Sequence, residues 1–428
     1  MIKKMIEIHN VGPIKKVCIE LNKINVFMGA QSSGKSTIAK IISYCNYIEK
    51  EVSLYQSLDK YNLKDDLFIS KLQLYHGLRG YFKNESKITF NSETIYLEYT
   101  SQLFTIKWNN KYTFINNEII YIPYERNVVN ILDTTTLKLP DNYLRSFLYK
   151  WFDARKKYEY SNHLNLLHLG VNYYFSASSK SNMISSNSDH YDIPLSYASS
   201  GIQSLTPLIV LIDYLTNENH KLFLNESYDD IIIKNDINLQ LLVDVVLKPI
   251  FNKYYQHNTT ENKDLIIQEI FNKYLRKDKL FEKQDYELTR IKDNLYNIHG
   301  CNMIIEEPEQ NLFPATQKEL IYYLLSKINS NDNNQLTLTT HSPYVLYAIN
   351  NCIIASIASE TNKITVSDKI NMSNLYKAKT NPNDISIFQL KNGYIECIQE
   401  EDGLIGNNFF DTHMKEVMDD YYSMLKYL

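Results

Sequence analysis

The stretch INVFMGAQSSGKSTIAKIISYC, residues 24–45, decides the fold of this chain of 428 residues. The octet Gly29–Ser36 fits the pattern G-x-x-x-x-G-K-[ST] at every fixed position, and it follows the apolar run 24–28. Its glycines allow a tight turn whose N–H groups point at phosphates, and the helix that begins near Lys35 adds its positive N-terminal dipole. The stretch therefore predicts a phosphate-binding loop between a strand and a helix, rather than a glycine turn without a ligand.

The loop predicts binding of ATP together with Mg²⁺. We expect Lys35 to reach the β- and γ-phosphates and to act in catalysis, and we expect Ser36 to ligate Mg²⁺. The predicted nucleotide-binding residues of the loop are Gly29, Ala30, Gln31, Ser32, Ser33, Gly34, Lys35, Ser36 and Thr37.

Composition places the chain among globular proteins. With 44% hydrophobic and 22% charged residues, it is long enough for one large or two ordinary domains. The formal net charge of -4 and the pI of about 6.2 indicate no global attraction to nucleic acid or to anionic membranes. Short basic clusters at 155–157 and 276–279 are typical of solvated helix faces, so nucleic-acid binding is left open but is not indicated by charge.

The cysteines and the hydropathy of the chain indicate the cellular compartment in which the protein works. Five scattered cysteines without C-x-x-C spacing favour a reducing environment and argue against a zinc site. The N-terminus has no long apolar segment, and the most apolar stretch, 205–215, is short and carries Asp213. We therefore expect a cytoplasmic protein with no role in the membrane.

Periodicity along the chain alternates between strands and helices. We expect strands within 5–28, antiparallel strands from about 66 to 122, helices at 141–170 and 203–220, a polar loop at 176–192, and helices over 229–296. A strand at 301–305, a helix from about 315 and a strand at 336–339 form a βαβ unit, which implies a parallel sheet. A hairpin around 391–393 precedes an amphipathic helix, 409–427, whose apolar face we expect to pack on its own domain.

Adjacent carboxylates follow the second apolar strand, in the segment MIIEEPEQNLFP at 303–314. Ligands of an open α/β sheet bind outside the carboxyl ends of its strands, so these side chains should abut the phosphates. We assign Glu306 to Mg²⁺ and Glu307 to orienting the attacking water, with Glu309 as a weaker candidate for metal or interface contacts. The alternative is a solvated acidic turn.

A histidine follows the third apolar strand, in the segment LTLTTHSPYVL at 336–346. At a strand end of the same edge, His341 can hydrogen-bond the γ-phosphate and take part in catalysis. A lone histidine is usually structural, and the functional interpretation depends on the two preceding motifs.

The three motifs in this order resemble the ABC-type ATPase heads of the SMC-like and OLD-like group within the AAA family, which includes the stand-alone ATPases of bacterial anti-phage systems such as PARIS and Septu. The resemblance implies an α/β fold: a parallel phosphate-loop core with an antiparallel β subdomain, plus a helical insertion. It divides the chain into an N-terminal lobe (1–225), the helical insertion (226–298), a C-terminal lobe (299–380) and a C-terminal hairpin and helix (381–428).

The resemblance also implies a signature segment equivalent to LSGGQ. The candidate opens a predicted helix and departs from LSGGQ, so an ordinary helix cap is the alternative. By resemblance it would contact the nucleotide bound to another copy, in a head-to-tail homodimer or a higher even-numbered assembly. Its nucleotide-binding residues are Ser199, Ser200, Gly201 and Gln203.

Two further features of such heads stay open in this sequence. The segment YIPYERN at 121–127 resembles one near the nucleotide, but the role of Arg126 is not assigned. The glutamine expected between the phosphate loop and the signature segment has three candidates, Gln56, Gln73 and Gln102.

The resemblance and the composition together predict an enzyme that hydrolyses ATP and acts as sensor, scaffold or switch for a separately encoded effector, a nuclease, in anti-phage defence. The residues after His341 carry no DxD-bearing Toprim pattern and no H-N-H cluster, so we expect the toxic chemistry elsewhere. The main alternative is a RecF-like DNA-repair ATPase that binds DNA directly. An ATP subunit of a membrane transporter is disfavoured by the long insertion and the degenerate signature.

Overall fold

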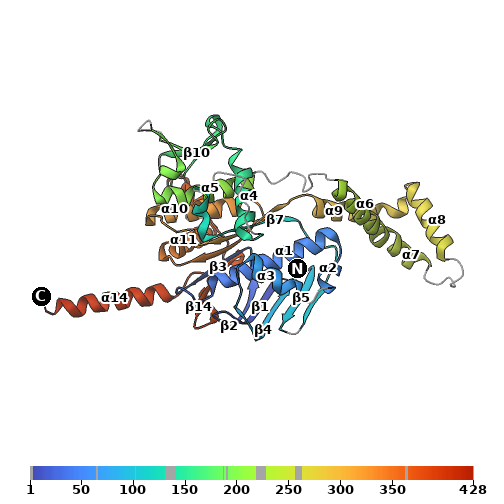
Figure 1. Cartoon of the computed structure of the whole chain (residues 1–428), viewed down its shortest axis with the longest axis horizontal. Helices are drawn as coiled ribbons and strands as arrows, with labels where there is room; N and C mark the ends of the chain where they lie inside the picture. The colour runs from blue at the N-terminus through green and yellow to red at the C-terminus, as the bar shows by residue number, and fades with distance from the viewer. Residues whose placement is uncertain are drawn as a thin grey trace.

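A computed structural model of the chain describes residues 3–63, 66–101, 103–130, 141–186, 188, 191–217, 228–255, 263–361 and 365–427 (Figure 1). Within these ranges its main feature is an eleven-stranded sheet. In sheet order the strands are β6 (Phe104–Trp108), β5 (Ile95–Thr100), β4 (Phe82–Asn91), β1 (Lys4–Val11), β2 (Ile14–Leu21), β15 (Tyr394–Cys397), β14 (Ile385–Lys391), β3 (Ile24–Gly29), β13 (Gln335–Thr340), β12 (Gly300–Glu306) and β7 (Asn117–Ile122).

The five strands β14, β3, β13, β12 and β7 are neighbours and run parallel. Every residue of β3 and β12 is buried, which is why the sequence reads there as an almost continuous apolar run. Because the strands are parallel, their carboxyl ends lie at one edge of the sheet. The predicted parallel core is confirmed.

The other part of the sheet is antiparallel and contains β1, β2, β4, β5 and β6. The strands expected within 5–28 are confirmed, and so is the hairpin of β14 with β15. The expectation of antiparallel strands over 66–122 was wrong at both ends. Residues Leu67–Tyr75 form helix α3, because Phe68 and Leu72 are buried at helical spacing, and β7 pairs parallel with β12.

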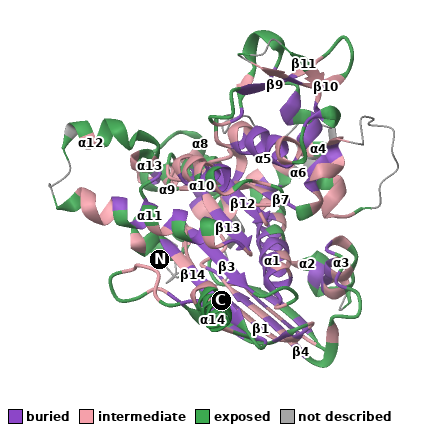
Figure 2. Cartoon of the chain, turned by 90° about the vertical axis from the view of Figure 1, so that its left-hand side faces the viewer, coloured by how far each residue is buried: buried purple, intermediate pink, exposed green. Residues whose placement is uncertain are grey.

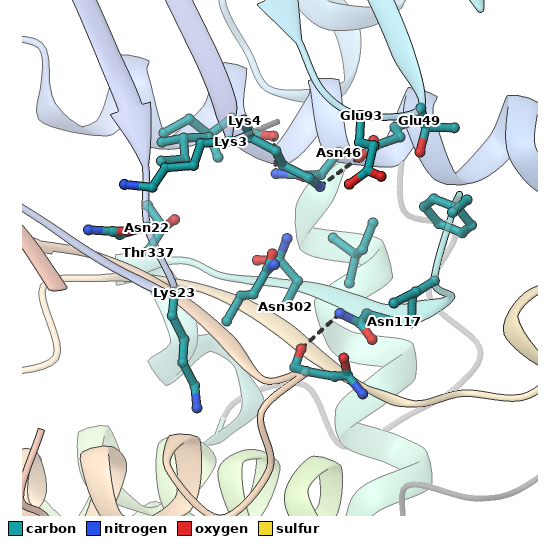
Figure 3. Close-up of a pocket in the computed structure, with 18 of the residues that line it drawn as sticks. Lys3, Lys4, Asn22, Lys23, Asn46, Glu49, Glu93, Asn117, Asn302 and Thr337 are labelled. Atoms are coloured by element: carbon teal, nitrogen blue, oxygen red, sulfur yellow. Dashed lines mark hydrogen bonds and ion pairs between the residues drawn. The ribbon is translucent and has the colours of Figure 1, made fainter. Parts of the chain in front are cut away.

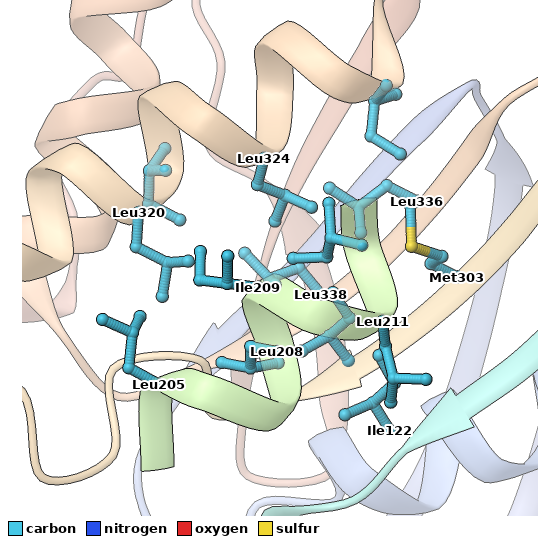
Figure 4. Packing of buried hydrophobic residues seen from close by; sticks show 14 of the residues in the cluster. Ile122, Leu205, Leu208, Ile209, Leu211, Met303, Leu320, Leu324, Leu336 and Leu338 are labelled. Carbon is cyan, nitrogen blue, oxygen red and sulfur yellow. The ribbon is translucent and has the colours of Figure 1, made fainter. Parts of the chain in front are cut away.

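Helices cover both faces of the parallel strands. They are α1 (Lys35–Tyr55) with α2 (Asp59–Asn62) and α3 near it, and α4 (Tyr143–Arg155), α5 (Ser200–Asn217), α10 (Pro314–Ile328), α11 (Pro343–Glu360), α12 (Val366–Asn371) and α13 (Ser373–Lys377). Figure 4 shows α5 packed between the sheet and α10, with Leu208, Leu324 and Leu338 in one large apolar cluster. The fold is therefore the predicted α/β head: a parallel phosphate-loop core, an antiparallel β subdomain and additional helices.

A small antiparallel sheet corrects two other expectations. Its strands are β8 (Leu164–Asn165), β9 (Val171–Ser176), β10 (Ser181–Ser186) and β11 (Asp192–Pro194). The polar loop expected at 176–192 contains β10, whose Asn182 and Ile184 are buried in alternation although the segment is rich in serine; residues 187, 189 and 190 lie outside the described part. The helix expected over 141–170 ends at Arg155, and β8 begins nine residues later.

The insertion is helical where it is described: α6 (Tyr228–Leu241), α7 (Lys248–Tyr255), α8 (Lys263–Leu275) and α9 (Glu282–Tyr296). Buried side chains such as Leu241, Phe281 and Leu288 form an apolar cluster of their own. Figure 1 shows these helices to one side of the sheet. The predicted boundary at 225 and 226 lies in 218–227, outside the described residues.

Helix α14 (Phe409–Leu425) projects from the body of the molecule (Figures 1 and 2). The expectation that its apolar face packs on its own domain was wrong beyond the first turn. Phe409 and Phe410 pack partly against the large cluster, but no residue of the helix is buried, and Val417 and Tyr421 are 63% and 56% exposed. Periodicity identifies an apolar face but not the surface that covers it.

Among the described helices, none combines the length and the apolar character that a membrane crossing requires.

Candidate functional site

The phosphate loop joins β3 to α1 in a conformation that needs its glycines. Gly29 and Gly34 have φ angles of 148° and 106°, and a Cβ on Gly29 would lie 2.7 Å from the carbonyl oxygen of Leu390. No side chain caps the N-terminus of α1, and its first turn holds no acidic residue. The helix therefore presents open N–H groups and its positive dipole end to an anion.

The Lys35 side chain is folded into this loop. Its Nζ donates hydrogen bonds to the carbonyl oxygens of Gly29 at 2.9 Å and Ala30 at 2.8 Å, and the residue is 4% exposed. Burial lowers the pKa of Lys35 to about 8, while the charges of Glu307 and Glu309 act in the opposite direction. The loop thus holds a buried cation within reach of the strand-end carboxylates.

Glu306 ends β12, the second strand from the loop, with β13 between them. It is 1% exposed, and neither carboxylate oxygen has a hydrogen-bond partner within 3.5 Å among the described residues. It lies close to the Tyr121 hydroxyl, whose pKa is raised by burial and by the Glu306 charge. A buried carboxylate with open oxygens is unfavourable by itself and suits a hard cation such as Mg²⁺.

Glu307 and His341 meet at the same edge. Glu307 adopts a left-handed backbone with φ 42°, and its Oε1 lies 3.3 Å from the Nε2 of His341. The hydrogen bond from His341 is the main cause that holds the pKa of Glu307 below its usual value. A non-glycine residue in this conformation is strained, and such strain is concentrated at functional sites.

The Glu309 side chain accepts hydrogen bonds from the residues at the end of β13. Its Oε1 accepts hydrogen bonds from the Thr340 hydroxyl at 2.9 Å and from the backbone N–H of His341 at 2.6 Å, and burial raises its pKa. In this structure the carboxylate therefore fixes the residue before His341 and the backbone of His341 itself.

Arg126, which the sequence left unassigned, lies beneath the glutamates. Its guanidinium is fully buried, and it donates to the backbone carbonyls of Glu306 at 2.9 Å and Glu307 at 2.8 Å. Its Nε donates to the carbonyl of Ser204 in α5 at 3.2 Å. Arg126 thus connects the turn after β12 to the helix that the signature-like segment opens. Sequence alone missed this role because it depends on backbone carbonyls more than 75 residues away.

The signature-like segment lies at the start of α5. Ser199 and Ser200 are exposed, and a Cβ on Gly201 would lie 3.0 Å from the carbonyl oxygen of Asn311. The side chain of Gln203 turns back and donates to the carbonyls of Ser196 at 3.0 Å and Ala198 at 2.8 Å. The two serines are accessible from outside, whereas the Nε2 of Gln203 donates within its own loop and its Oε1 accepts from Asn130 at 3.4 Å.

The three glutamine candidates lie at different places relative to the phosphate loop. Gln56 follows the 21 residues of α1, so it lies roughly 30 Å from the phosphate loop at 1.5 Å per residue. Gln73 lies on α3, and Gln102 lies outside the described residues. The position of Gln56 argues against a contact with the nucleotide.

Comparison with known proteins adds one match in sequence. Residues 301–346, which contain Glu306, Glu307 and His341, match the family described as an AAA ATPase domain. No match was found among curated proteins. The phosphate loop, the strand-end carboxylates and this match define an enzyme of the P-loop class that hydrolyses ATP.

Similar solved structures include two SMC heads and RecF. The SMC head domain from Thermotoga maritima has 12% identity and a TM-score of 0.37, with 94% of this chain and 100% of that chain covered. The Smc head domain from Pyrococcus furiosus, bound to the C-terminal domain of ScpA, has 8% identity, coverages of 97% and 98%, and a TM-score of 0.36. The recombination mediator RecF with ATP has 10% identity, coverages of 92% and 98%, and a TM-score of 0.28. At TM-scores below 0.5 these likenesses carry no argument, and the fold assignment rests on the strand order.

Proposed function

We propose that the carboxyl edge of the parallel sheet binds and hydrolyses Mg-ATP, and that two copies of the chain complete each site. The proposal depends on one observation: the phosphate loop, Glu306, Glu307 and His341 converge at a single sheet edge. In this arrangement the Nζ of Lys35 exchanges carbonyl oxygens of its own loop for phosphate oxygens of ATP.

The residues present fit a magnesium ion. Ser36 is partly exposed in the first turn of α1, and Glu306 offers buried oxygens without hydrogen bonds. These two residues would hold Mg²⁺, directly or through water, and the ion when bound neutralises charge on the β- and γ-phosphates.

Glu307 and His341 take the positioning roles around the γ-phosphate. The lowered pKa of Glu307 keeps its carboxylate ionised, so it accepts a hydrogen bond from the attacking water and orients it. The Nε2 of His341, 3.3 Å from that carboxylate, exchanges this partner for a γ-phosphate oxygen when one is present.

The signature-like segment would act on the nucleotide of a second copy. The exposed Ser199 and Ser200 open α5, and the N-terminus of a helix suits a phosphate. In a C₂ dimer the signature-like segment of each copy would contact the nucleotide bound to the other copy.

Light scattering during size-exclusion chromatography tests this assembly. With Mg-ATP, Glu307→Gln is expected to elute as a dimer or a higher even-numbered assembly, and to elute as a monomer without nucleotide. The double variant Glu307→Gln, Gly201→Glu is the matched control, since a carboxylate there repels phosphate and the added side chain meets the Asn311 carbonyl. An ATP-bound dimer that persists in the double variant contradicts the role of the segment.

The biological role that we propose is that of a sensor, scaffold or switch whose nucleotide state controls a separately encoded nuclease in bacterial anti-phage defence. The support is the order of the three motifs in the sequence.

Co-purification with the product of the neighbouring gene, with plaque counts in a host that carries both genes, tests this role. Stable complex formation and fewer plaques, both lost in Lys35→Ala, are expected. Intrinsic nuclease activity of the chain without a partner contradicts the proposal. Retention of DNA at moderate salt, dependent on ATP and without any partner, would instead support the RecF-like alternative.

A further inference from the structure

A cavity of about 480 Å³ lies at the amino edge of the parallel sheet, opposite the phosphate loop (Figure 3). Its lining includes the starts of three parallel strands, at Asn117 of β7, Asn302 of β12 and Gln335 of β13. Asn46 of α1 and Phe114, just before β7, also line it. A cavity of this volume is of the size that binds small molecules.

The floor of the cavity contains polar groups whose hydrogen bonds are unmet. Asn302 and Thr337, on neighbouring central strands, are 5% and 3% exposed; the described residues give their side chains no hydrogen bond, and their polar atoms open onto the cavity. The Oδ1 of Asn117 is likewise buried without a partner in that part of the chain. Parallel strands covered on both faces are normally apolar, and buried polar side chains are normally bonded. The Oδ1 of Asn117 and the open side chains of Asn302 and Thr337 are therefore free to bond a molecule that enters the cavity.

Charge at the rim argues against an anionic partner. Lys3 is paired with Glu20, Lys4 with Glu49 at 2.6 Å, and Lys23 with Asp332 at 3.9 Å. Each of these three lysines already faces a carboxylate. Glu93 adds a further carboxylate to the lining, so the cavity offers hydrogen bonds rather than net positive charge.

The walls are apolar and the floor presents amide edges. Leu21, Ile42, Phe114, Ile115 and Ile119 line the cavity. An amide carries a donor and an acceptor side by side, so it pairs in bidentate fashion with the edge of a heterocycle such as adenine, and apolar walls suit the faces of such a ring.

We propose that this cavity binds a neutral planar heterocycle of the nucleoside class. The Asn302 amide reads the edge of the base, and Thr337 and the Oδ1 of Asn117 supply further hydrogen bonds. The site is separate from the phosphate loop, because Asn302 precedes Glu306 by four residues on β12, about 13 Å along the strand. The inference is independent of the proposed function.

The test uses adenosine, guanosine, cytidine and uridine with the full-length protein, because nucleosides lack the phosphates that the loop requires. Saturation-transfer NMR and calorimetry measure their binding. At least one nucleoside is expected to bind saturably, with its affinity reduced about ten-fold in Asn302→Leu and less in Thr337→Val. Lys3→Gln, at the exposed rim, is the matched control and keeps the affinity within about two-fold, because no charge is required.

Two further readouts separate this site from the phosphate loop. Lys35→Ala is expected to keep nucleoside binding, and Asn302→Leu to keep ATP binding, which also shows that it folds. The proposal is overturned if none of the four nucleosides binds, if Lys35→Ala abolishes nucleoside binding, or if binding is the same in Asn302→Leu, Thr337→Val and the wild type.

Discussion

At the carboxyl edge of the parallel sheet β12 ends in Glu306, and at the amino edge the same strand begins with Gly300, two residues before Asn302. The first edge gathers ionisable groups, among them Lys35, Glu307 and His341. The second presents amides and a hydroxyl, with its rim lysines paired and one further carboxylate, Glu93, in its lining. At the carboxyl edge opposite charges face one another, so a charged ligand can bind between them. At the amino edge hydrogen-bonding groups face the cavity, so a neutral ligand can bond to them.

The largest expected effect on ligand binding at the carboxyl edge is that of Lys35→Ala. Lys35→Ala removes the cation that we propose to face the phosphates, and binding of ATP is expected to fall below detection in calorimetry. Lys40→Ala, in the next turn of α1, is the control and should bind ATP like the wild type. ATP binding of normal strength in Lys35→Ala would show that the loop is not the nucleotide site.

Glu307→Gln is expected to lower turnover by roughly 10²–10³-fold with little change in ATP affinity, because an amide cannot take part in orienting the water as a base does. Steady-state phosphate release and calorimetry measure the two quantities. Glu319→Gln, on α10, serves as the matched change of the same type. Equal turnover in Glu307→Gln and wild type would remove Glu307 from its assigned role.

Arg126 is expected to act through backbone positions rather than on the nucleotide. Arg126→Met should lower kcat about ten-fold and leave KM nearly unchanged, since the guanidinium bonds to the carbonyls of Glu306 and Glu307. Arg126→Lys is expected to recover part of kcat, because an ammonium reaches fewer of these carbonyls than the fork of arginine does.

Arg145→Met is the control for this series, since Arg145 is paired with Asp141 at the surface. Thermal unfolding of each variant establishes that it is folded. A rise in KM with an unchanged kcat would contradict a positioning role for Arg126.

The last prediction concerns the pH dependence of stability rather than catalysis. In the folded chain the pKa of Lys35 is about 8, below its ordinary value of 10.5, so between these values the unfolded chain binds more protons than the folded one. The free energy of unfolding should therefore gain roughly 2 kcal/mol from this residue as the pH rises from 8 to 10.5, with the penalty fully present below pH 8. Denaturant unfolding of wild type and Lys35→Met measures the difference. The same pH slope in both would show that Lys35 is not held as a buried cation.

Much of the carboxyl edge could be predicted from the sequence because each of its parts carries a local signal. The octet Gly29–Ser36, the glutamates after β12 and the histidine after β13 each follow a short apolar strand, and parallel pairing brings the ends of these strands together. Such signals need only a few neighbouring residues.

The remaining features depend on contacts between distant segments. The direction of β7 is set by its pairing with β12, and the place of Arg126 by carbonyls of the turn after β12 and of α5. The amino-edge cavity is likewise formed by the starts of separate strands. From the sequence alone, Asn302 could be interpreted only as part of an apolar strand. Serine-rich β10 and the exposed α14 were misread because composition and periodicity do not state which surface a segment meets.

The anchoring of α14 gives this helix a mechanical connection to the phosphate loop. Its first N–H, on Phe409, donates to the Oε1 of Gln389 in β14 at 2.6 Å, and the next residue of that strand, Leu390, is the register partner of Gly29. The helix extends about 25 Å over its 17 residues. A load at its far end is therefore a torque on the strand against which the phosphate loop rests.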